Sequence, residues 1–501
     1  GSHPEYAKDR QEKILNKMHK EGYISAIQKE NAIKKRLNFK KVSDRILAPH
    51  FVLYVKDLLV KKYGEELVQQ GGLKVITSLD SNIQNFAQEV VSSEVDKLSS
   101  YHVTNGASLI TNPATGEILA MVGSKNYFDT KIEGNVNVVL SLRQPGSAIK
   151  PINYAVGLMS KYTAATPFVD QKTCFPNPTG KDYCPVNYDG KWHGIVQMRY
   201  ALGNSINIPA VKMLKLNGVE AMTATSSAMG ITTFTDPDRY GLSLTLGGGD
   251  VTMIDMAQAF GVFANQGYKI TLHPILKITK NDGKILGKYN PPKSPIFGKK
   301  ILPSTVSFII SDILADNSAR SIEFGENSAL KIKDKIVSVK TGTTNDLRDN
   351  WTIGYTPSFV VATWVGNNDN SPMNNLASGI TGAAPIWNKI MTYLLKDKPQ
   401  EPAQRPVGVI QKKICSTSGL LPPPDNTPNA CPTRFEYFIK GTEPARLDPG
   451  MQKAFIDKST NNLAAPKQTD NVEERDSLIV TDPTGDSYCL TCPQPTVSPV
   501  P

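Results

Sequence analysis

The sequence has few histidines and no long apolar run. No stretch of apolar residues is long enough to cross a bilayer. The six histidines form no His-Glu-x-x-His pattern, and no Gly-x-Ser-x-Gly elbow surrounds a candidate serine, which argues against zinc peptidases and Ser-His-Asp hydrolases. The glycines at 247–249 are not followed by Gly-Lys-Ser/Thr, so they are not a phosphate loop. We therefore expect chemistry that needs no metal and no cofactor.

The formal net charge is +10, with lysines concentrated at residues 29–41 and 277–300. A charge of this size is compatible with binding to anionic polymers, lipid headgroups or nucleic acid. The sequence contains no zinc-finger, RNP-type or basic-helix pattern that would read bases. We interpret most of the charge as a solvated, Lys-rich surface and expect no nucleic-acid partner.

The cysteines fall into three local pairs, which are Cys174 with Cys184, Cys415 with Cys431, and Cys489 with Cys492. Short loops of this kind suit disulfides in an oxidising compartment. Six unrelated thiols and a zinc site are the alternatives, and zinc is weakened because no CxxC is matched by a second one. Sequence alone does not fix the pairing, so the first two pairs are our hypothesis for the disulfides.

Apolar periodicity predicts a mixed α/β fold. Residues 6–37 alternate charged and apolar side chains at helical spacing, as in a connector. Beyond Gly71-Gly72 we predict a helix at 81–98 and strands at 73–77, 107–110, 118–122, 336–339 and 359–365. Strands on either side of a central helical block indicate a sheet with helices on its faces, the α/β (α+β) class.

The predicted boundaries give four parts. Residues 1–70 form the connector and 71–398 the main domain. Proline becomes frequent after Lys398, and two cysteines return there, so we expect a small module at 399–460. Residues 461–501 are rich in Asn, Asp, Thr and Pro and are predicted to be a flexible tail.

Ser147-Ala148-Ile149-Lys150 follows a Pro-Gly turn and precedes a helix-like run. On a helix, a spacing of three places Lys150 on the same face as Ser147. A serine hydroxyl becomes a good nucleophile when a base removes its proton, and lysine can do so if burial or a nearby cation lowers its pKa. The spacing recurs at Ser328 and Lys331 in a polar stretch, and we interpret that copy as chance.

Two further motifs follow in order, Ser205-Ile206-Asn207 and Lys340-Thr341-Gly342-Thr343. Together the three motifs are typical of penicillin-binding proteins and serine β-lactamases, with Ile206 where a Ser-Asp-Asn motif has Asp. The wider segments at 144–151, 187–190, 246–249, 340–346, 351–357 and 381–387 resemble class A, bifunctional penicillin-binding proteins. This resemblance spans about residues 72–395. Less specifically, the start of the chain resembles the end of a glycosyltransferase domain and its linker.

The resemblance implies a role for each motif residue. Ser147 would attack the carbonyl between two terminal D-alanines, with Lys150 as the base. Ser205 would carry a proton and Asn207 would fix the lysine and the substrate amide, although both residues are also suited to capping the next helix. Lys340 would supply a standing positive charge that lowers the Lys150 pKa and attracts the substrate carboxylate.

The strand that follows Lys340 would bind substrate. Thr341 and Thr343 would hydrogen-bond the carboxylate, and Gly342 would let the ligand backbone approach, with a β-bulge as the alternative reading. The backbone N–H groups of Ser147 and Thr343 would form an oxyanion hole.

The resemblance also implies a penicillin-binding transpeptidase fold, a central antiparallel sheet flanked by helices with a helical subdomain carrying the nucleophile. It implies peptidoglycan stem peptides as partners and covalent inhibition by β-lactams. Gly1-Ser2-His3 is typical of a cloning scar, so we expect a glycosyltransferase domain and a membrane anchor upstream, and an extracytoplasmic location. The rival functions are a serine β-lactamase, a D,D-carboxypeptidase and a non-catalytic β-lactam sensor.

Overall fold

The computed structural model describes residues 4–35, 37, 46–176, 180–374, 381–424, 431–465 and 467–493. The chain divides into two compact units, Gly1–Leu47 and Ala48–Pro501. In the first unit, α1 (Pro4–Lys20) and α2 (Ala26–Lys34) form the predicted helical segment. Ser25 and Gln28 start α2 with a reciprocal capping box. The predicted lysine cluster at 29–41 continues outside the described residues.

The second unit contains a five-stranded antiparallel sheet. Its order is β10-β11-β12-β2-β3, with β10 at Ser338–Thr343, β11 at Asp349–Tyr355, β12 at Val360–Gly366, β2 at Asn105–Thr111 and β3 at Ile118–Val122. This arrangement confirms the predicted fold class. Successive strand residues point to opposite faces, so Leu109 packs into one core and Ile110 into the other. Both faces are covered, which explains the nearly continuous apolar runs.

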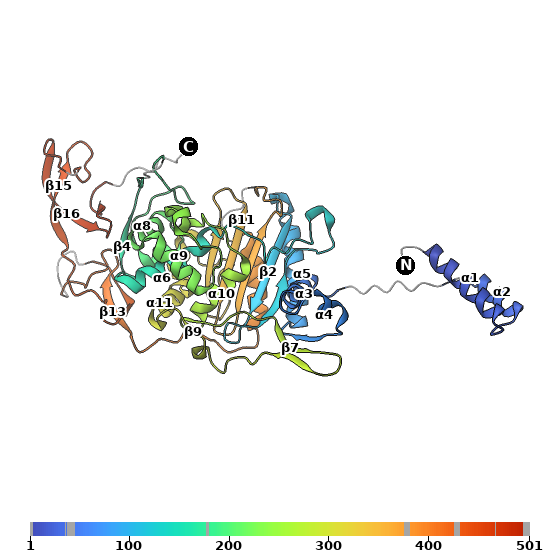
Figure 1. Cartoon of the computed structure of the whole chain (residues 1–501). Helices are drawn as coiled ribbons and strands as arrows, with labels where there is room; N and C mark the ends of the chain where they lie inside the picture. The colour runs from blue at the N-terminus through green and yellow to red at the C-terminus, as the bar shows by residue number, and fades with distance from the viewer. Residues whose placement is uncertain are drawn as a thin grey trace. The chain divides into compact units, whose positions relative to one another are not determined.

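Helices cover the two faces of the sheet (Figure 1). On one face lie α5 (Ser81–Lys97) and α14 (Ala383–Leu395), which also contact each other. On the other face lie α10 (Met253–Ala264) and α11 (Ser304–Ala315). Beyond them is a helical subdomain of α6 (Lys150–Ser160), α7 (Met198–Gly203), α8 (Asn207–Asn217) and α9 (Val219–Met229). Nearly the whole of α6 is buried, which explains why it is apolar on all sides.

On the N-terminal side, one prediction is confirmed and one is wrong. The strand predicted at 73–77 is β1 (Lys74–Thr77), which pairs with β7 (Ile275–Thr279) in a separate sheet completed by β8 (Ile285–Lys288). The connector predicted at 1–70 ends earlier, because α3 (Pro49–Tyr63) buries Phe51, Val55 and Leu59 in the main core. α4 (Glu65–Gln70) follows directly. Lys61 and Lys62 at the end of α3 made its apolar face less evident.

Two small sheets and several single-turn helices also belong to this part of the fold. β4 (Pro167–Asp170) pairs with β5 (Gly194–Gln197), and β6 (Tyr268–Lys269) pairs with β9 (Lys299–Lys300). Single-turn helices occur at Gly146–Ile149 (η3), Leu242–Leu246 (η5) and Ser321–Phe324 (α12). η3 contains Ser147, and β4 ends at Asp170.

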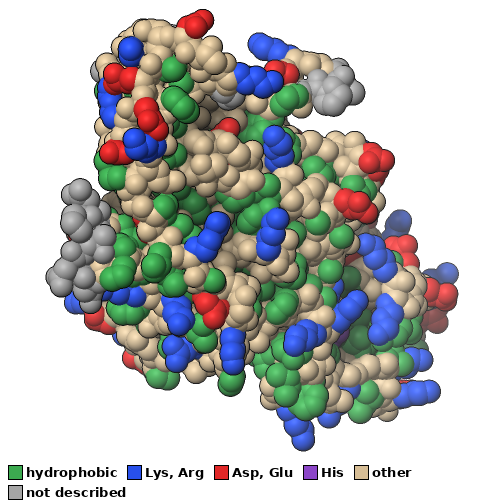
Figure 2. Space-filling view, turned by 90° about the vertical axis from the view of Figure 1, so that its left-hand side faces the viewer, with side chains coloured by type: hydrophobic (Ala, Val, Ile, Leu, Met, Phe, Trp, Pro, Cys, Tyr) green, Lys and Arg blue, Asp and Glu red, His purple; other side chains and the backbone are tan. Residues whose placement is uncertain are grey.

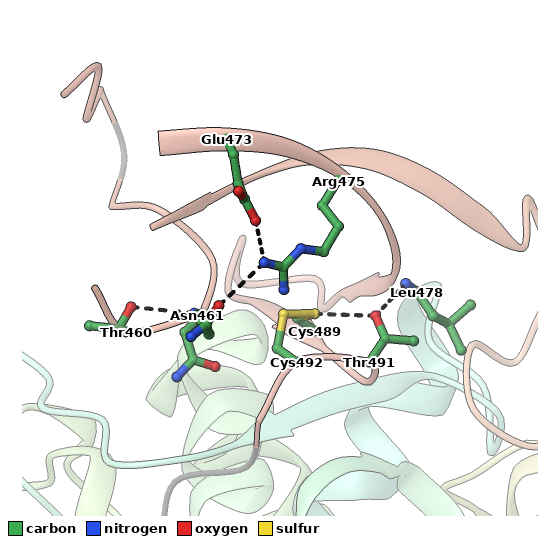
Figure 3. Close-up of a disulfide and its surroundings, with 9 residues drawn as sticks. Thr460, Asn461, Glu473, Arg475, Leu478, Cys489, Thr491 and Cys492 are labelled. Carbon is green, nitrogen blue, oxygen red and sulfur yellow. Dashed lines mark hydrogen bonds and ion pairs between the residues drawn. A yellow bond between two sulfur atoms is a disulfide. The ribbon is translucent and has the colours of Figure 1, made fainter. Parts of the chain in front are cut away.

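The C-terminal region is more ordered than predicted. After β13 (Val409–Cys415) and β14 (Thr433–Ile439), β15 (Met451–Asp457), β16 (Val472–Thr481) and β17 (Ser487–Cys489) form a three-stranded sheet. The flexible tail predicted from residue 461 is therefore wrong up to residue 493, and residues 494–501 lie outside the described ones. Polar composition concealed this sheet because its core is small and includes the Cys489–Cys492 disulfide (Figure 3).

The structure contains the three disulfides Cys174–Cys184, Cys415–Cys431 and Cys489–Cys492. Asp448 lies close enough to Cys415 and Cys431 to share a metal with them, but both sulfurs are committed to the disulfide. Among the described residues, no helix has the length and apolar character needed to span a membrane. Figure 2 shows basic side chains scattered among acidic and apolar ones on the face that carries the C-terminal strands in Figure 1.

A buried ionic cluster joins β14 to the helical subdomain. Arg199 of α7 binds both carboxylate oxygens of Glu436, at 2.8 and 2.6 Å, and also contacts Asp312 and Asp316 at 2.6 and 3.1 Å. The Glu436 side chain is fully buried. Arg199 and Glu436 are both shielded from water, so removing one of them leaves the charge of the other poorly compensated.

We therefore predict that Arg199→Met destabilises the fold by about 2–3 kcal/mol, less than the usual cost of about 3–5 kcal/mol for a buried charge left without any partner, because Arg434 still contacts Glu436 at 2.7 Å. The control is Arg475→Met, since Arg475 pairs with Glu473 in an exposed contact that should contribute at most about 1 kcal/mol. Urea or thermal unfolding of both variants measures the difference. Equal losses would contradict a structural role for the Arg199 cluster.

Candidate active site

The candidate nucleophile lies where the helical subdomain meets the edge strand of the large sheet. Ser147 is in η3, and Lys150 begins α6 directly after it. Ser147 is half-buried, whereas the Lys150 side chain is completely buried. The predicted helical spacing therefore places the hydroxyl at the surface of the site and the amine one turn behind it.

The ε-amino group of Lys150 is surrounded by oxygens of the second motif. Its Nζ lies within hydrogen-bonding distance of Asn207 Oδ1 at 2.7 Å, of the Ser205 carbonyl at 2.5 Å and of the Ile206 carbonyl at 3.2 Å. Burial lowers the pKa of Lys150 well below its ordinary value, and the charge of Lys340 lowers it further. A lysine in this state is available as a neutral base.

Ser205 lies between the two buried lysines. Its hydroxyl accepts a hydrogen bond from Lys340 Nζ at 2.8 Å and lies 3.5 Å from Lys150 Nζ. Ser205 adopts a left-handed conformation with φ of 62°, which is costly for a residue other than glycine and holds the hydroxyl in this position. The capping alternative does not apply, because Ile206 occupies the N-cap of α8 and no side chain caps it.

Lys340 is the second buried cation of the site. Burial lowers the pKa of Lys340 to about 7. The negative charge of Glu323 raises this pKa and the positive charge of Arg320 lowers it, but burial has the largest effect. Its Nζ also donates to the Thr341 carbonyl at 2.9 Å. Lys340 can therefore change its charge near neutral pH and, with it, the field at Lys150.

A row of buried polar groups supports Asn207 from behind. The Asn207 backbone N–H donates to Asn187 Oδ1 at 2.9 Å, and Asn187 Nδ2 donates to both oxygens of Asp170 at 3.0 and 2.8 Å. Asp170 also accepts from the backbone and ring nitrogens of His193, each at 2.8 Å. Asp170 and His193 were not predicted as site residues, and only the Asn-Tyr-Asp-Gly segment at 187–190 pointed to this region.

Thr341, Gly342 and Thr343 lie on β10, which is the edge of the sheet and open to an added strand. Gly342 needs its lack of a side chain for a reason other than the predicted one. A Cβ there would lie 2.1 Å from the Pro145 carbonyl oxygen and 2.8 Å from the Ala148 nitrogen. Gly342 thus lets η3 approach the strand closely, and its predicted role toward the substrate stays a prediction. The register through Gly342 is continuous, so the β-bulge alternative is wrong.

Two other glycines permit the same close approach. Gly146 has φ of +53°, and a Cβ on it would meet the backbone of Thr343 at 2.6 Å. A Cβ on Gly247 would lie 2.2 Å from the Gly146 nitrogen. The nucleophile turn is therefore clamped between β10 and the turn that follows η5.

The structure brings Ser147, Lys150, Ser205, Asn207 and Lys340 to one place. The second Ser-x-x-Lys copy is not helical, since Ser328 lies in a turn and Lys331 is exposed. The four predicted cysteines form the disulfides Cys174–Cys184 and Cys415–Cys431. None of them is among the groups that contact the Lys150 amine.

A helical subdomain that presents a serine and a buried lysine to the edge strand of an antiparallel sheet defines a serine acyltransferase of the penicillin-recognising class. The penicillin binding protein transpeptidase domain family matches residues 106–392, and the C-terminal domain family of penicillin-binding protein 1A matches residues 405–453. The chain belongs to the penicillin-binding protein transpeptidase family and is a D,D-transpeptidase of the serine type.

Known relatives agree with this assignment. Penicillin-binding protein 1A of Aquifex aeolicus is 28% identical, with 88% of this chain and 69% of the relative aligned. Penicillin-binding protein 2D of Bacillus subtilis is 29% identical, with 94% and 66% aligned. Penicillin-binding protein 1A of Clostridium botulinum (strain Langeland) is 30% identical, with 91% and 58% aligned. The chain thus spans from 58% to 69% of the length of these three relatives.

Solved structures share the fold. Penicillin-binding protein 1A from Haemophilus influenzae superposes with a TM-score of 0.74 at 24% identity, covering 88% of this chain and 83% of that one. The PonA1 protein from Mycobacterium tuberculosis in complex with penicillin V gives 0.57 at 20% identity, covering 72% and 97%.

We predict that Gly342→Ala slows acylation by penicillin by about 10²-fold, the scale expected when a reacting group is displaced by about 1 Å. The added methyl group would push η3 and Ser147 away from β10. The control is Gly241→Ala, because a Cβ on Gly241 meets nothing within 4 Å and its φ is negative. Stopped-flow acylation of both variants tests the prediction, and equal rates would contradict it.

We also predict a bell-shaped pH dependence of the acylation rate constant. The rate should rise as Lys150 loses its proton and fall above about pH 7 as Lys340 loses its charge. In Lys340→Met the falling limb should disappear. The rising limb should move to higher pH, because Lys340 no longer lowers the Lys150 pKa. An unchanged profile in Lys340→Met would contradict this division of roles.

Proposed function

We propose that Ser147 Oγ attacks the carbonyl carbon between the two terminal D-alanines of a peptidoglycan stem peptide. A bond forms between Oγ and this carbon, and the peptide C–N bond breaks. The proton of Ser147 passes to Lys150 and then to the departing D-alanine amine. An amine of a second stem peptide then attacks the ester, which releases Ser147 and leaves a cross-link. The observation that carries this proposal is the fully buried Lys150 amine, held by Asn207 and Ser205 one turn from Ser147.

The Ser205 hydroxyl is suited to carry the proton from Lys150 to the leaving amine. It lies 3.5 Å from Lys150 Nζ and 2.8 Å from Lys340 Nζ, so both lysines are within its reach. Thr341 and Thr343 would bind the terminal carboxylate beside the charge of Lys340. The backbone N–H groups of Ser147 and Thr343 would receive the negative charge that develops on the carbonyl oxygen.

β-Lactams would enter the same reaction at the first step. Attack on the β-lactam carbonyl opens the ring, and the amine stays attached to the acyl group. The enzyme then remains as a stable ester when neither water nor a stem-peptide amine completes the second step. A β-lactamase would hydrolyse the β-lactam ester quickly. A carboxypeptidase would transfer the peptide acyl group to water. A sensor would stop at the ester both with β-lactams and with stem peptides.

The cellular setting is also part of the proposal. Three disulfides support an extracytoplasmic location, because such bonds persist in oxidising compartments. The chain covers 58% to 69% of the length of three relatives, and we propose, from the resemblance to class A penicillin-binding proteins, that the natural protein also has a glycosyltransferase domain and a membrane anchor. We propose that residues 48–398 form the transpeptidase domain and that the C-terminal strands are attached to it.

Ser147→Ala should abolish covalent labelling by fluorescent penicillin and leave thermal stability nearly unchanged, because it removes the nucleophile and little volume. Ser328→Ala is the matched control and should label at the normal rate. Intact mass after benzylpenicillin treatment, with peptide mapping of the adduct, locates the ester. An adduct that persists in Ser147→Ala would exclude this serine as the nucleophile.

The fate of the acyl group separates the rival functions in the same preparation. A burst of nitrocefin hydrolysis without sustained turnover excludes a β-lactamase. Release of D-alanine together with a cross-linked product from stem peptides distinguishes a transpeptidase from a carboxypeptidase, and absence of D-alanine release would indicate a sensor.

A further inference from the structure

Asp482 is a buried carboxylate in a segment that neither matching family covers. It lies between β16 and β17, after the residues 405–453 that match the C-terminal domain family. Its Oδ2 accepts from Lys212 Nζ at 2.7 Å and from the Val169 backbone N–H at 3.0 Å. The side chains of Asp482 and Lys212 are 0% and 1% exposed, and Asp486 contacts the same amine at 2.6 Å.

These contacts close the free edge of the β4–β5 hairpin. Lys212 Nζ also donates to the Val169 carbonyl at 2.8 Å, so both backbone groups of Val169 are held by the Lys212–Asp482 pair. Tyr488 covers the other strand, because a Cβ on Gly194 would lie 2.8 Å from its ring. The segment from Asp482 to Tyr488 therefore contacts both strands of the hairpin through side chains.

The hairpin and α8 are joined a second time through the active-site network. Asp170 follows Val169 and holds Asn187, which accepts from the backbone N–H of Asn207. Asn207 is the first residue of α8, and Lys212 lies on the same helix. β4 and α8 are thus linked on one side by Asn187 and on the other by Asp482.

We propose that Asp482 is a positioning residue for the transpeptidase, which fixes β4 against α8 and thereby holds Asn207 on the Lys150 amine. The C-terminal segment then sets the rate of acylation without touching the substrate. This inference rests on the proposed roles of Lys150 and Asn207.

The test uses the whole chain with Asp482→Asn, Asp482→Glu and Tyr488→Ala. The control is Glu474→Gln, since Glu474 lies on β16 in an exposed contact with Lys453. Stopped-flow measurements with benzylpenicillin separate the acylation rate constant from the binding constant. We expect Asp482→Asn to lower the rate constant about tenfold with little change in binding, less than the 10²-fold that a displacement of about 1 Å costs. Asp482→Glu should recover part of the rate.

Two further variants decide between positioning and simple stability. In Lys212→Met/Asp482→Leu the buried charges are gone, so thermal stability should recover while acylation stays slow. Tyr488→Ala leaves the ion pair intact and should slow acylation by a smaller factor, even if Asp482→Asn does not fold. Normal rate constants in the variants that fold, whatever their melting temperatures, would overturn the proposal. Asn207→Ala is measured in parallel, because a normal rate there would refute the proposed site instead.

Discussion

The four oxygens around the Lys150 amine, from Ser205, Ile206 and Asn207, are all neutral. Burial makes an ammonium ion costly here, and none of these oxygens belongs to a carboxylate that would offset the cost, so burial favours the uncharged amine. A neutral amine can donate two hydrogen bonds to such oxygens and still direct its lone pair at a hydroxyl. Lys212 is buried in the opposite way, against the carboxylates of Asp482 and Asp486. Lys150 is thus arranged for proton transfer and Lys212 for attachment.

The base is useful only if Ser147 stays close to it, and backbone packing supplies that constraint. η3 is held between β10 and the turn after η5 at distances that exclude any side chain on Gly146, Gly247 and Gly342. The helical subdomain and the sheet therefore approach each other through backbone atoms, which cannot change rotamer. This packing explains why the third motif contains glycine, a requirement that the sequence pattern alone had assigned to the ligand.

The sequence was most informative where its signal is local. The nearly continuous apolar runs of β2 and β12 and the spacing of Ser147 and Lys150 depend on neighbours a few residues away, so apolar runs and motifs predicted them. Asp170 and Asp482 were missed because their partners are distant in the chain. The Asp482 carboxylate meets an amine 270 residues away, and its polar surroundings resemble those of a disordered tail. α3 was missed for a different reason. Lysines lie beside its buried face, so its apolar pattern is hard to recognise in the sequence.

The attachment of the C-terminal strands bears on the strain at Ser205. These strands have small cores of their own, so they depend on disulfides and on buried ionic contacts with the rest of the unit. Arg199, on the helix before the Ser205-Ile206-Asn207 turn, binds Glu436, and Lys212, on the helix after it, binds Asp482. A left-handed serine keeps its conformation only when the structure around it is rigid. Both helices that flank the strained turn are fixed by a buried cation to strands outside the matched transpeptidase region, so the geometry of the base depends on the C-terminal part of the chain.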